Sequence, residues 1–380
     1  MIYIFWVCII VLLFAYFGYP FYVYIRSRFF KNPVLKNLKF APFVSVVMSV
    51  YNEEAYIERK INNLLQSIYP KDRLEILVGS DGSRDGTNAI LLRMSNDQVR
   101  AFIFPKRRGK ASVLNDIVPK ARGEILIFCD ARQAFDKDAV SQLAANFADE
   151  KVGCASGELV FDKAFSINGV SEGVGLYWDY EKFIRKSESA IHSMVGATGA
   201  IYAIRKKLYK EPHADAILDD VYIPLAIVRQ GYRSIWDSEA KAYDKPAFTP
   251  QEEYMRKVRT LAGNYQIFAM FKDLFNPFRS AVSIPLVSHK LLRALAPFFL
   301  ISMFVSNLFI AKKDFYGAFF ICQIIFYILA FMGSAAYNKK SKKTLVRIAS
   351  TAYMFCLLNF TALVGFYRFV FRKQEIAWER

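Results

Sequence analysis

Hydrophobic residues are concentrated at the two ends of the chain. Residues 2–25 carry no charged side chain, and this run exceeds the ~20 residues that a helix needs to cross a bilayer. It lacks the basic start and cleavage site of a secretory signal, which favours an uncleaved anchor. Three further apolar runs lie at 294–311, 315–337 and 345–371. The pattern predicts one transmembrane helix at 1–26 and three more within 294–372.

The segment at 276–293 has a different character. It mixes cations with apolar side chains just before the second group of apolar runs. Such a mixture is typical of a helix that lies in the membrane interface. We therefore predict an amphipathic interface segment here, with a plain connector as the alternative.

Residues 40–270 alternate between strand and helix patterns. Buried strand patterns occur at 43–50, 74–81, 100–104 and 124–132, and helical spacing or polar turns separate them. Strands that alternate with helices pair in parallel, and ligands bind at the carboxyl ends of such strands. The order predicts one α/β domain with a site where these strands end.

The formal net charge of +17 limits the classes of binding partner that fit the chain. No compact basic motif suggests nucleic acid, so anionic lipids and phosphate-bearing ligands fit better. Basic residues gather directly after the first apolar run and at 338–343. Because positive loops stay in the cytoplasm, we expect a multi-pass protein of the cell (inner or plasma) membrane with its α/β domain in the cytoplasm.

The cysteines and histidines of the chain show no pattern typical of a disulfide or metal-binding site. The five cysteines are odd in number and show no CxxC spacing, which favours reduced, packed thiols. His192, His213 and His289 are dispersed along the sequence and lack the spacing of metal ligands. We assign all three to structural positions.

Several polar groups follow the predicted strands. Asp81 and Asp85 in "SDGSRDGT" are placed to bind a nucleobase or ribose, or only to shape a turn. Lys110 belongs to a basic run around a glycine before a helix, which suits a diphosphate or a solvated loop. Asp130 ends the strand in "CDAR", and Arg132 follows it where a second carboxylate would complete a metal motif.

Two later motifs carry charge at helical positions. Asp219 and Asp220 open an apolar helix, where acids serve as caps or, in a sugar transfer, as a base for an acceptor hydroxyl. Arg256 and Arg259 are three residues apart and share a helical face. They suit either a diphosphate or anionic lipid.

In this order the motifs resemble family 2 glycosyltransferases, in the membrane-embedded branch of cellulose, hyaluronan and poly-N-acetylglucosamine synthases. The resemblance covers nearly the whole chain. It implies a GT-A fold, a Rossmann-like α/β domain that binds nucleotide-diphospho-sugars, followed by α-helical transmembrane segments. The motifs that carry it are "VYNEE", "SDGSRDGT", "RGKASVLN", "CDAR", "GATGAIYAIRKKLY", "LDDVYIPLAIVRQG" and "RKVRT".

The resemblance implies a role for each matching residue. Asp220 matches the general base, and Asp130 matches the first acid of the metal motif, with Mg²⁺ or Mn²⁺ held by one protein carboxylate. The acceptor side includes Asp219 with Thr198 and Gly199. The donor site comprises Tyr51, Glu53, Asp81, Lys110, Asp130, Arg256 and Arg259.

Two departures from the family pattern bear on function. The synthases carry a QxxRW motif, whereas this chain reads Arg256 to Thr260 and lacks the tryptophan. This favours single addition or a homo-oligomeric pore over processive synthesis within one chain. Arg132 either helps a cation to neutralise the diphosphate or pairs with a nearby acid.

The leading expectation is inverting transfer from a UDP-sugar to build a cell-surface or exopolysaccharide glycan with a β linkage. The alternative within this class is one addition to a lipid-linked (polyprenyl) oligosaccharide. A non-catalytic scaffold subunit of a polysaccharide assembly complex belongs to a different class, and the three aspartates at 81, 130 and 220 argue against it. Expected partners are the donor, a glycan or lipid-linked acceptor, membrane lipids, and a second copy or an export protein, but no nucleic acid.

Overall fold

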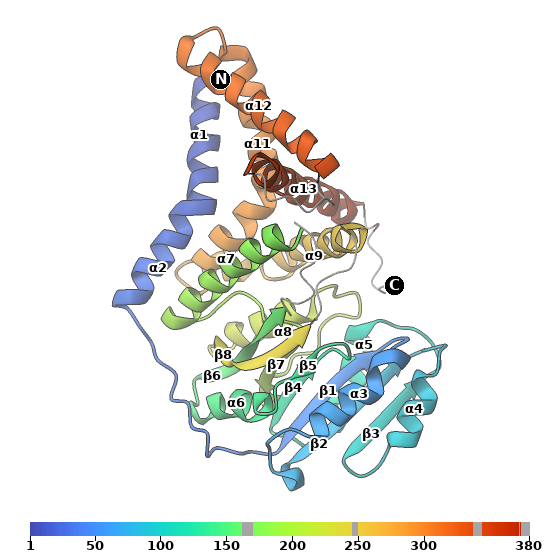
Figure 1. Cartoon of the computed structure of the whole chain (residues 1–380). Helices are drawn as coiled ribbons and strands as arrows, with labels where there is room; N and C mark the ends of the chain where they lie inside the picture. Colours follow the sequence, from blue (N-terminus) through green and yellow to red (C-terminus); the bar gives the residue numbers. More distant parts are fainter. Residues whose placement is uncertain (162–169, 245–249, 337–343, 372, 374–380) are drawn as a thin grey trace.

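The computed structural model describes residues 1–161, 170–244, 250–336, 344–371 and 373. An α/β domain lies at one end, apolar helices project from the other, and α7 and α9 lie between them (Figure 1). The N-terminus lies at the far end of the apolar helices. The basic run at 338–343, on which the predicted orientation partly depends, lies outside the described residues.

The domain is built on one mixed sheet in the order β3-β2-β1-β4-β7-β6-β8-β5. β1 pairs in parallel with β2 and β4, and β2 pairs in parallel with β3, whereas β7 runs antiparallel to β4 and β6. The strands in the described residues are β1 (Val44–Val50), β2 (Leu74–Asp81), β3 (Val99–Phe104), β4 (Ile125–Cys129), β5 (Ala134–Phe135), β6 (Val152–Phe161), β7 (Ile201–Arg205) and β8 (Arg233–Asp244).

Helices cover both faces of this sheet. Val46 packs in one core with α3 (Glu54–Leu65), α4 (Thr87–Met94) and α6 (Ala139–Ala145), while the next residue, Val47, packs on the opposite side with α5 (Lys110–Ile117) and α8 (Asp219–Arg229). Successive strand residues point to opposite faces, so a strand covered on both faces is apolar throughout. Short 3₁₀ turns lie at Lys71–Arg73, Val118–Lys120, Asn146–Ala148, Lys206–Leu208 and Lys272–Phe275.

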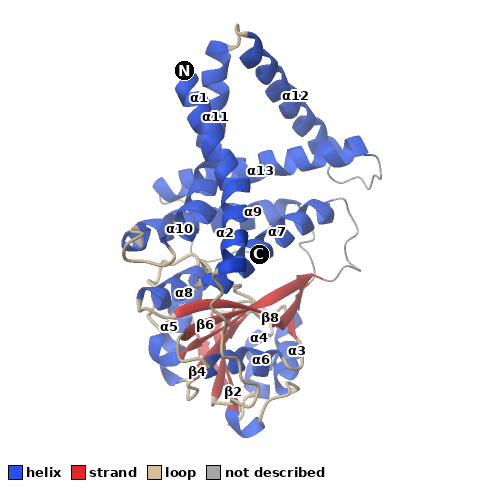
Figure 2. Cartoon of the chain, turned by 90° about the vertical axis from the view of Figure 1, so that its left-hand side faces the viewer, coloured by secondary structure: helices blue, strands red, loops and turns tan. Residues whose placement is uncertain are grey.

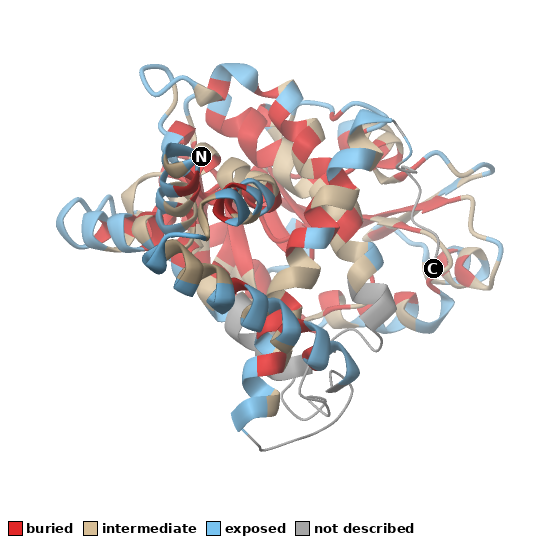
Figure 3. Ribbon diagram, turned by 90° about the horizontal axis from the view of Figure 1, so that it is seen from above, coloured by how far each residue is buried: buried red, intermediate tan, exposed pale blue. Residues whose placement is uncertain are grey.

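Four helices are long and apolar enough to cross a membrane: Ile2–Phe29, Ser283–Ile310, Asp314–Ala335 and Thr344–Val370. The first joins α1 (Ile2–Leu13), a π-helical turn η1 (Phe14–Gly18) and α2 (Tyr19–Phe29). The second joins α10 (Ser283–Pro285), η8 (Leu286–Leu291) and α11 (Leu292–Ile310), and α12 (Asp314–Ala336) and α13 (Thr344–Val370) follow. Exposed positions are frequent on the helices nearest the N-terminus when the molecule is seen from above (Figure 3).

Two details of this helical layer differ from a simple bundle. Within the segment 276–293, for which an interface element remains the prediction, a helix begins at Ser283 and continues as α11. α13 lies across the direction of α1 and α11 (Figure 2). α7 (Val170–Ile191) and α9 (Pro250–Met270) form the layer below it.

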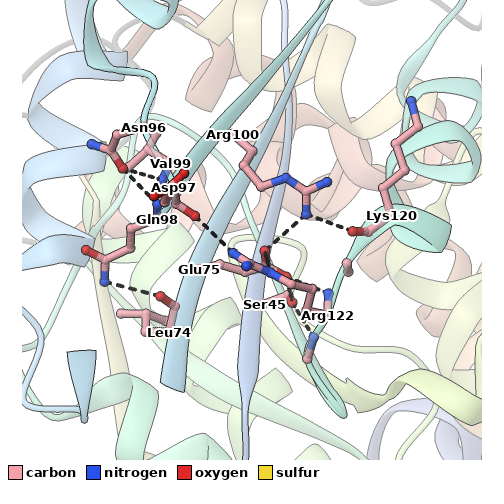
Figure 4. Close-up of polar contacts among 12 residues, drawn as sticks. Ser45, Leu74, Glu75, Asn96, Asp97, Gln98, Val99, Arg100, Lys120 and Arg122 are labelled. Atoms are coloured by element: carbon pink, nitrogen blue, oxygen red, sulfur yellow. Dashed lines mark hydrogen bonds and ion pairs between the residues drawn. The ribbon is translucent and has the colours of Figure 1, made fainter. Parts of the chain in front are cut away.

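A buried carboxylate ties the parallel strands together at the end opposite their carboxyl termini. Glu75 is fully buried and accepts hydrogen bonds from Ser45 Oγ at 2.6 Å and from the Arg122 backbone N–H at 2.5 Å. Its other oxygen pairs with Arg122 Nε at 2.8 Å and with Arg100 at 3.1 Å. Figure 4 shows these groups converging on the carboxylate. Burial raises the Glu75 pKa, but the hydrogen bonds from Ser45, Arg122 and Arg100 together outweigh it and leave the pKa lowered.

We expect Glu75→Gln to lower the free energy of unfolding by about 1.5–3 kcal/mol, because charge-assisted hydrogen bonds are lost at a buried position. A lowered pKa in the folded state means that this stabilisation is present above the ordinary glutamate pKa and is lost as the pH falls. Thermal unfolding at pH 7 and pH 4 measures both effects. The control is Glu58→Gln, because the Glu58–Arg93 pair is exposed and we expect a change of at most ~1 kcal/mol. Equal losses for the two variants would contradict the stabilising role of Glu75.

Candidate active site

One cavity of about 980 Å³ lies where β1, β2 and β4 end, and residues of α7, α9, α11 and α13 complete its wall. The structure brings every residue assigned to donor, acceptor or catalysis from the sequence to this wall. They are Tyr51, Glu53, Asp81, Lys110, Asp130, Thr198, Gly199, Asp219, Asp220, Arg256 and Arg259.

Asp81 fixes the basic loop that follows β3. Its carboxylate accepts hydrogen bonds from the backbone N–H groups of Arg108 and Gly109, at 2.7 and 2.8 Å. A Cβ on Gly82, whose φ is +70°, would lie 2.7 Å from the Arg107 nitrogen, so only glycine permits this approach. Asp85, by contrast, accepts from Thr87 and from the Glu54 N–H. Asp85 therefore shapes the turn.

Tyr51 forms an aromatic surface on the wall of the cavity. The Arg107 guanidinium lies 3.8 Å from the centre of its ring. Glu53 is buried beside it, and its backbone N–H donates to Thr87 Oγ1 at 2.8 Å. A flat ring next to a guanidinium and a carboxylate has the chemistry to hold a nucleoside.

Lys110 lies between two acids that come from distant parts of the sequence. Its Nζ is 3.1 Å from Asp130 Oδ1 and 3.2 Å from Asp219 Oδ2. Burial lowers the pKa of Lys110, but Asp130, Asp219 and Asp220 raise it by more, so the ammonium stays charged. The carboxylates of Asp130, Asp219 and Asp220 therefore surround the Lys110 ammonium group on the cavity wall.

Arg132 pairs with a nearby acid, which is the second of the two roles expected for it from the sequence. Its guanidinium pairs with Asp244 Oδ2 at 2.7 Å, and the Gln133 side chain donates to the same oxygen at 2.9 Å. The side chain of Asp244 is only 3% exposed. Arg132 thus pairs with an acid at the end of β8 in this structure, and nothing in its sequence neighbourhood pointed to that partner.

Asp220 lies in the first turn of α8, with Gly199 against it. Burial and the neighbouring Asp219 raise the pKa of Asp220 to about 6, although Lys110 acts in the opposite direction. A carboxylate with a pKa near neutrality is suited to accept a proton during a reaction at neutral pH. The arrangement gives the cavity one base candidate beside a cation.

Gly199 is expected to be essential for the position of that carboxylate. A Cβ at Gly199 would lie 2.9 Å from Asp220 Oδ2, so Gly199→Ala must displace the carboxylate or its neighbours. A misplacement near 1 Å at a reacting group costs about 100-fold in rate. We expect kcat to fall by about that factor with the donor dissociation constant within about twofold of wild type. Unchanged kcat would show that the Asp220 position does not matter.

The layer above the cavity contributes Arg259, which the sequence singled out, and Arg185, which it did not. Arg185 on α7 donates to Thr198 Oγ1 at 3.3 Å and lies among the charges that act on Asp220. Arg259 on α9 donates to the Ile217 carbonyl at 3.2 Å. Arg185 occurs in "YEKFIRKSES", where alternating charge looks like a solvated helix surface. Only the docking of α7 over the sheet reveals its position.

The described residues contain no cluster of three or more His, Cys, Asp or Glu side chains that could hold a metal ion. One carboxylate is nevertheless suitable, since the Asp130 side chain is 45% exposed within the cavity. Mg²⁺ is commonly bound through one or two carboxylates together with substrate phosphates and water. The Asp130 carboxylate therefore suits a divalent cation that is held jointly by this side chain and by a phosphate group of a ligand.

Comparisons with known proteins identify relatives of this chain. Residues 45–211 match the family model described as glycosyl transferase family 2. Poly-beta-1,6-N-acetyl-D-glucosamine synthase of Staphylococcus aureus (strain COL) is 23% identical over 242 residues, which are 62% of this chain and 58% of the synthase. The chain therefore matches less than two thirds of that relative's length. Probable glycosyltransferase YdaM of Bacillus subtilis (strain 168) is 34% identical over 129 residues, 32% of this chain and 31% of that protein.

A solved structure shares the fold along almost the whole chain. Mannosyltransferase PcManGT from Pyrobaculum calidifontis, in complex with GDP-Man and Mn²⁺, has a TM-score of 0.73 and 22% identity, with 98% of this chain and 100% of that chain covered. This likeness confirms the predicted α/β fold with its apolar helices.

Proposed function

We propose, from the premise that this chain contains a glycosyltransferase family 2 domain with the GT-A fold, that it transfers a sugar from a nucleotide-diphospho-sugar to an acceptor hydroxyl. The observation that carries the proposal is the cavity itself. It holds the loop fixed by Asp81, the cation Lys110, and the carboxylates Asp130 and Asp220 on one continuous wall. The donor chemistry and the base candidate thus face the same space.

The reaction needs one base and a stabilised leaving group. Asp220 accepts the proton of an acceptor hydroxyl, the acceptor oxygen bonds to the anomeric carbon, and the bond from that carbon to the diphosphate breaks. Direct displacement inverts the anomeric configuration, so an α-linked donor gives a β-linked product. Lys110, Arg256 and Arg259 offer positive charge for the departing diphosphate.

A divalent cation fits this arrangement. Asp130, with oxygens of the donor phosphates, would hold Mg²⁺ or Mn²⁺, which would supply further positive charge to the leaving diphosphate. The mannosyltransferase structure is a complex with Mn²⁺, which supports this part of the proposal. UDP is proposed as the carrier, and the GDP-Man in that same complex makes GDP the first alternative to test.

We further propose that the product belongs to a cell-surface glycan or exopolysaccharide. The similarity to a poly-beta-1,6-N-acetyl-D-glucosamine synthase supports this product class. Four helices long and apolar enough to cross a membrane support a protein of the cell membrane, and its domain is proposed to face the cytoplasm, where nucleotide sugars are made. A scaffold role without catalysis would leave the base candidate and its cation without a purpose.

The test offers purified protein in nanodiscs a panel of UDP- and GDP-sugars with Mg²⁺, Mn²⁺ or EDTA, together with extracted membrane lipids. Release of the nucleoside diphosphate and the size and solubility of the labelled product are measured. We expect turnover of one donor class and a strong decrease in EDTA. No turnover of any nucleotide sugar under any condition would contradict the proposed function.

A further inference from the structure

The segment 215–218 leads directly into the carboxylates at the start of α8. Leu218 is the N-cap of this helix, and Asp219 and Asp220 belong to its first turn. Residues 215–218 themselves form neither helix nor strand, so contacts from other elements must hold them in place. A shift of this segment also shifts Asp220, because the chain is continuous and short between them.

α9 holds the segment through hydrogen bonds from one of its faces. Gln266 Oε1 accepts a hydrogen bond from the Ile217 backbone N–H at 3.0 Å, and Gln266 Nε2 donates to the Asp215 carbonyl at 2.9 Å. Arg259 donates to the Ile217 carbonyl at 3.2 Å. Backbone groups that lie outside regular elements need such partners where water does not reach them. The Gln266 amide therefore stabilises one path of the segment into α8.

The same face of α9 lets the segment approach closely. Gly263 lies between Arg259 and Gln266 on this face, since residues three and four apart are neighbours on a helix. A Cβ at Gly263 would lie 2.5 Å from Leu218 Cγ and 3.1 Å from Ile217 Cγ2. A side chain at this position would push against the residue that precedes Asp219.

The apolar helices α11 and α13 hold α9 on another face. α9 lies between α13 and the α/β domain (Figure 2). A Cβ at Gly365 of α13 would lie 2.9 Å from the Ala262 backbone nitrogen. The Tyr265 hydroxyl donates to the Ala294 carbonyl of α11 at 2.7 Å, and the Tyr265 ring meets Phe366 of α13 with the ring centres 5.3 Å apart. α9 is thus fixed between the apolar helices and the segment that leads to the base.

We propose that Gln266 and Gly263 are positioning residues for Asp220, and that α13 acts on the base through its contact with α9 at Gly365. The base is held on its other side by Ala197, whose N–H donates to the Asp220 carbonyl at 2.7 Å. A general base must lie within hydrogen-bond reach of the proton that it removes. A displaced segment therefore lowers the rate of transfer. The inference rests on the proposed function, because the position of Asp220 matters only if a hydroxyl gives it a proton.

Gln230 offers a matched comparison on the same helix. It lies at the C-terminal end of α8, where its Nε2 donates to the Leu208 and Ala226 carbonyls at 3.0 and 2.9 Å. Gln230→Met and Gln266→Met each remove two side-chain hydrogen bonds to the backbone. Only Gln266→Met acts on the end of α8 that carries the base. A contact that merely stabilises the fold should give similar effects in both variants.

Purified variants in nanodiscs are compared for thermal unfolding, donor binding and transfer at saturating donor. We expect Gln266→Met to lower kcat about tenfold, because a shift of a fraction of 1 Å at a reacting group is costly. Its donor dissociation constant should stay within about twofold of wild type. Gln230→Met should lose similar thermal stability and keep kcat within about twofold. Equal kcat in the two variants would overturn the positioning role of Gln266.

A pair of glycines tests the action of α13. Gly365→Ala disturbs the contact between α13 and α9, whereas a Cβ at Gly333 of α12 would lie 2.0 Å from the Ala349 carbonyl oxygen of α13. Both changes disturb α13, but only the first does so at α9. We expect kcat to fall about tenfold in Gly365→Ala and less than about threefold in Gly333→Ala. A loss in Gly333→Ala that equals or exceeds the loss in Gly365→Ala would overturn the action through α9.

Backbone hydrogen exchange tests the contacts without turnover. Because the Ile217 N–H donates to Gln266, the peptide that contains residues 215–218 should exchange faster in Gln266→Met than in wild type. Gln230→Met should leave its exchange unchanged. Unchanged exchange in Gln266→Met would overturn the inference even if the wild type transfers sugar. Absence of transfer by the wild type, together with the expected exchange, would instead refute the proposed transferase.

Discussion

Asp220→Asn is expected to reduce sugar transfer by about 100- to 10,000-fold, the range that a positioned general base contributes. Asparagine has nearly the same shape but cannot accept the proton of the acceptor hydroxyl. Asp220 lies at the start of α8 beside Gly199, and it is Asp81 that accepts the backbone hydrogen bonds of the loop at Arg108 and Gly109. The donor dissociation constant should therefore remain within about threefold of wild type.

Asp219→Asn is the matched control for this prediction. Asp219 also lies in the first turn of α8, but its carboxylate pairs with Lys110 and meets the Tyr202 hydroxyl at 3.5 Å. We expect it to lose less transfer than Asp220→Asn, with a larger effect on donor binding because it helps to hold Lys110. If Asp219→Asn were the more damaging variant for turnover at saturating donor, the base would be the wrong aspartate.

Lys110→Gln should produce the second large effect. The ammonium is the one cation in direct contact with Asp130 and Asp219 among the described residues. Its removal leaves three carboxylates facing the donor diphosphate, and loss of one electrostatic contact to a transition state costs about 100- to 1000-fold in kcat.

The pH dependence distinguishes this role from simple donor binding. Lys110 lowers the pKa of Asp220, which is about 6 with the lysine present. In wild type, kcat/KM should rise with pH through about 6 and then level off, because the base must be deprotonated. In Lys110→Gln the rise should move to higher pH. A profile that keeps its midpoint would show that the two side chains are not coupled.

The fold and the residues that line the cavity could be predicted from the sequence because both depend on local patterns. Asp81, Lys110 and Asp130 each follow a strand or open a helix, and parallel strands bring such residues to one edge. Asp220 was identified by its motif and by its place at a helix start. None of these inferences required knowledge of how distant segments pack.

The sequence could not predict contacts that depend on packing between layers. Arg132 had two open roles, and its pairing with Asp244 follows from the alignment of β8 beside β5 at the far side of the sheet. Arg185, Lys290 and Arg293 come from α7, η8 and α11. They looked like ordinary surface or interface cations, because no local pattern indicates that helices far apart in the chain will close over one cavity.

The stereochemistry of transfer tests the central claim most directly. Wild-type protein in nanodiscs is given the active nucleotide sugar and its acceptor, and the anomeric proton of the transferred sugar is followed by NMR with Asp220→Asn as the reference. We expect an α-linked donor to yield a β-linked product in wild type and almost no product in the variant. A product that retains the α configuration, or one formed equally fast by Asp220→Asn, would contradict direct displacement with Asp220 as the base.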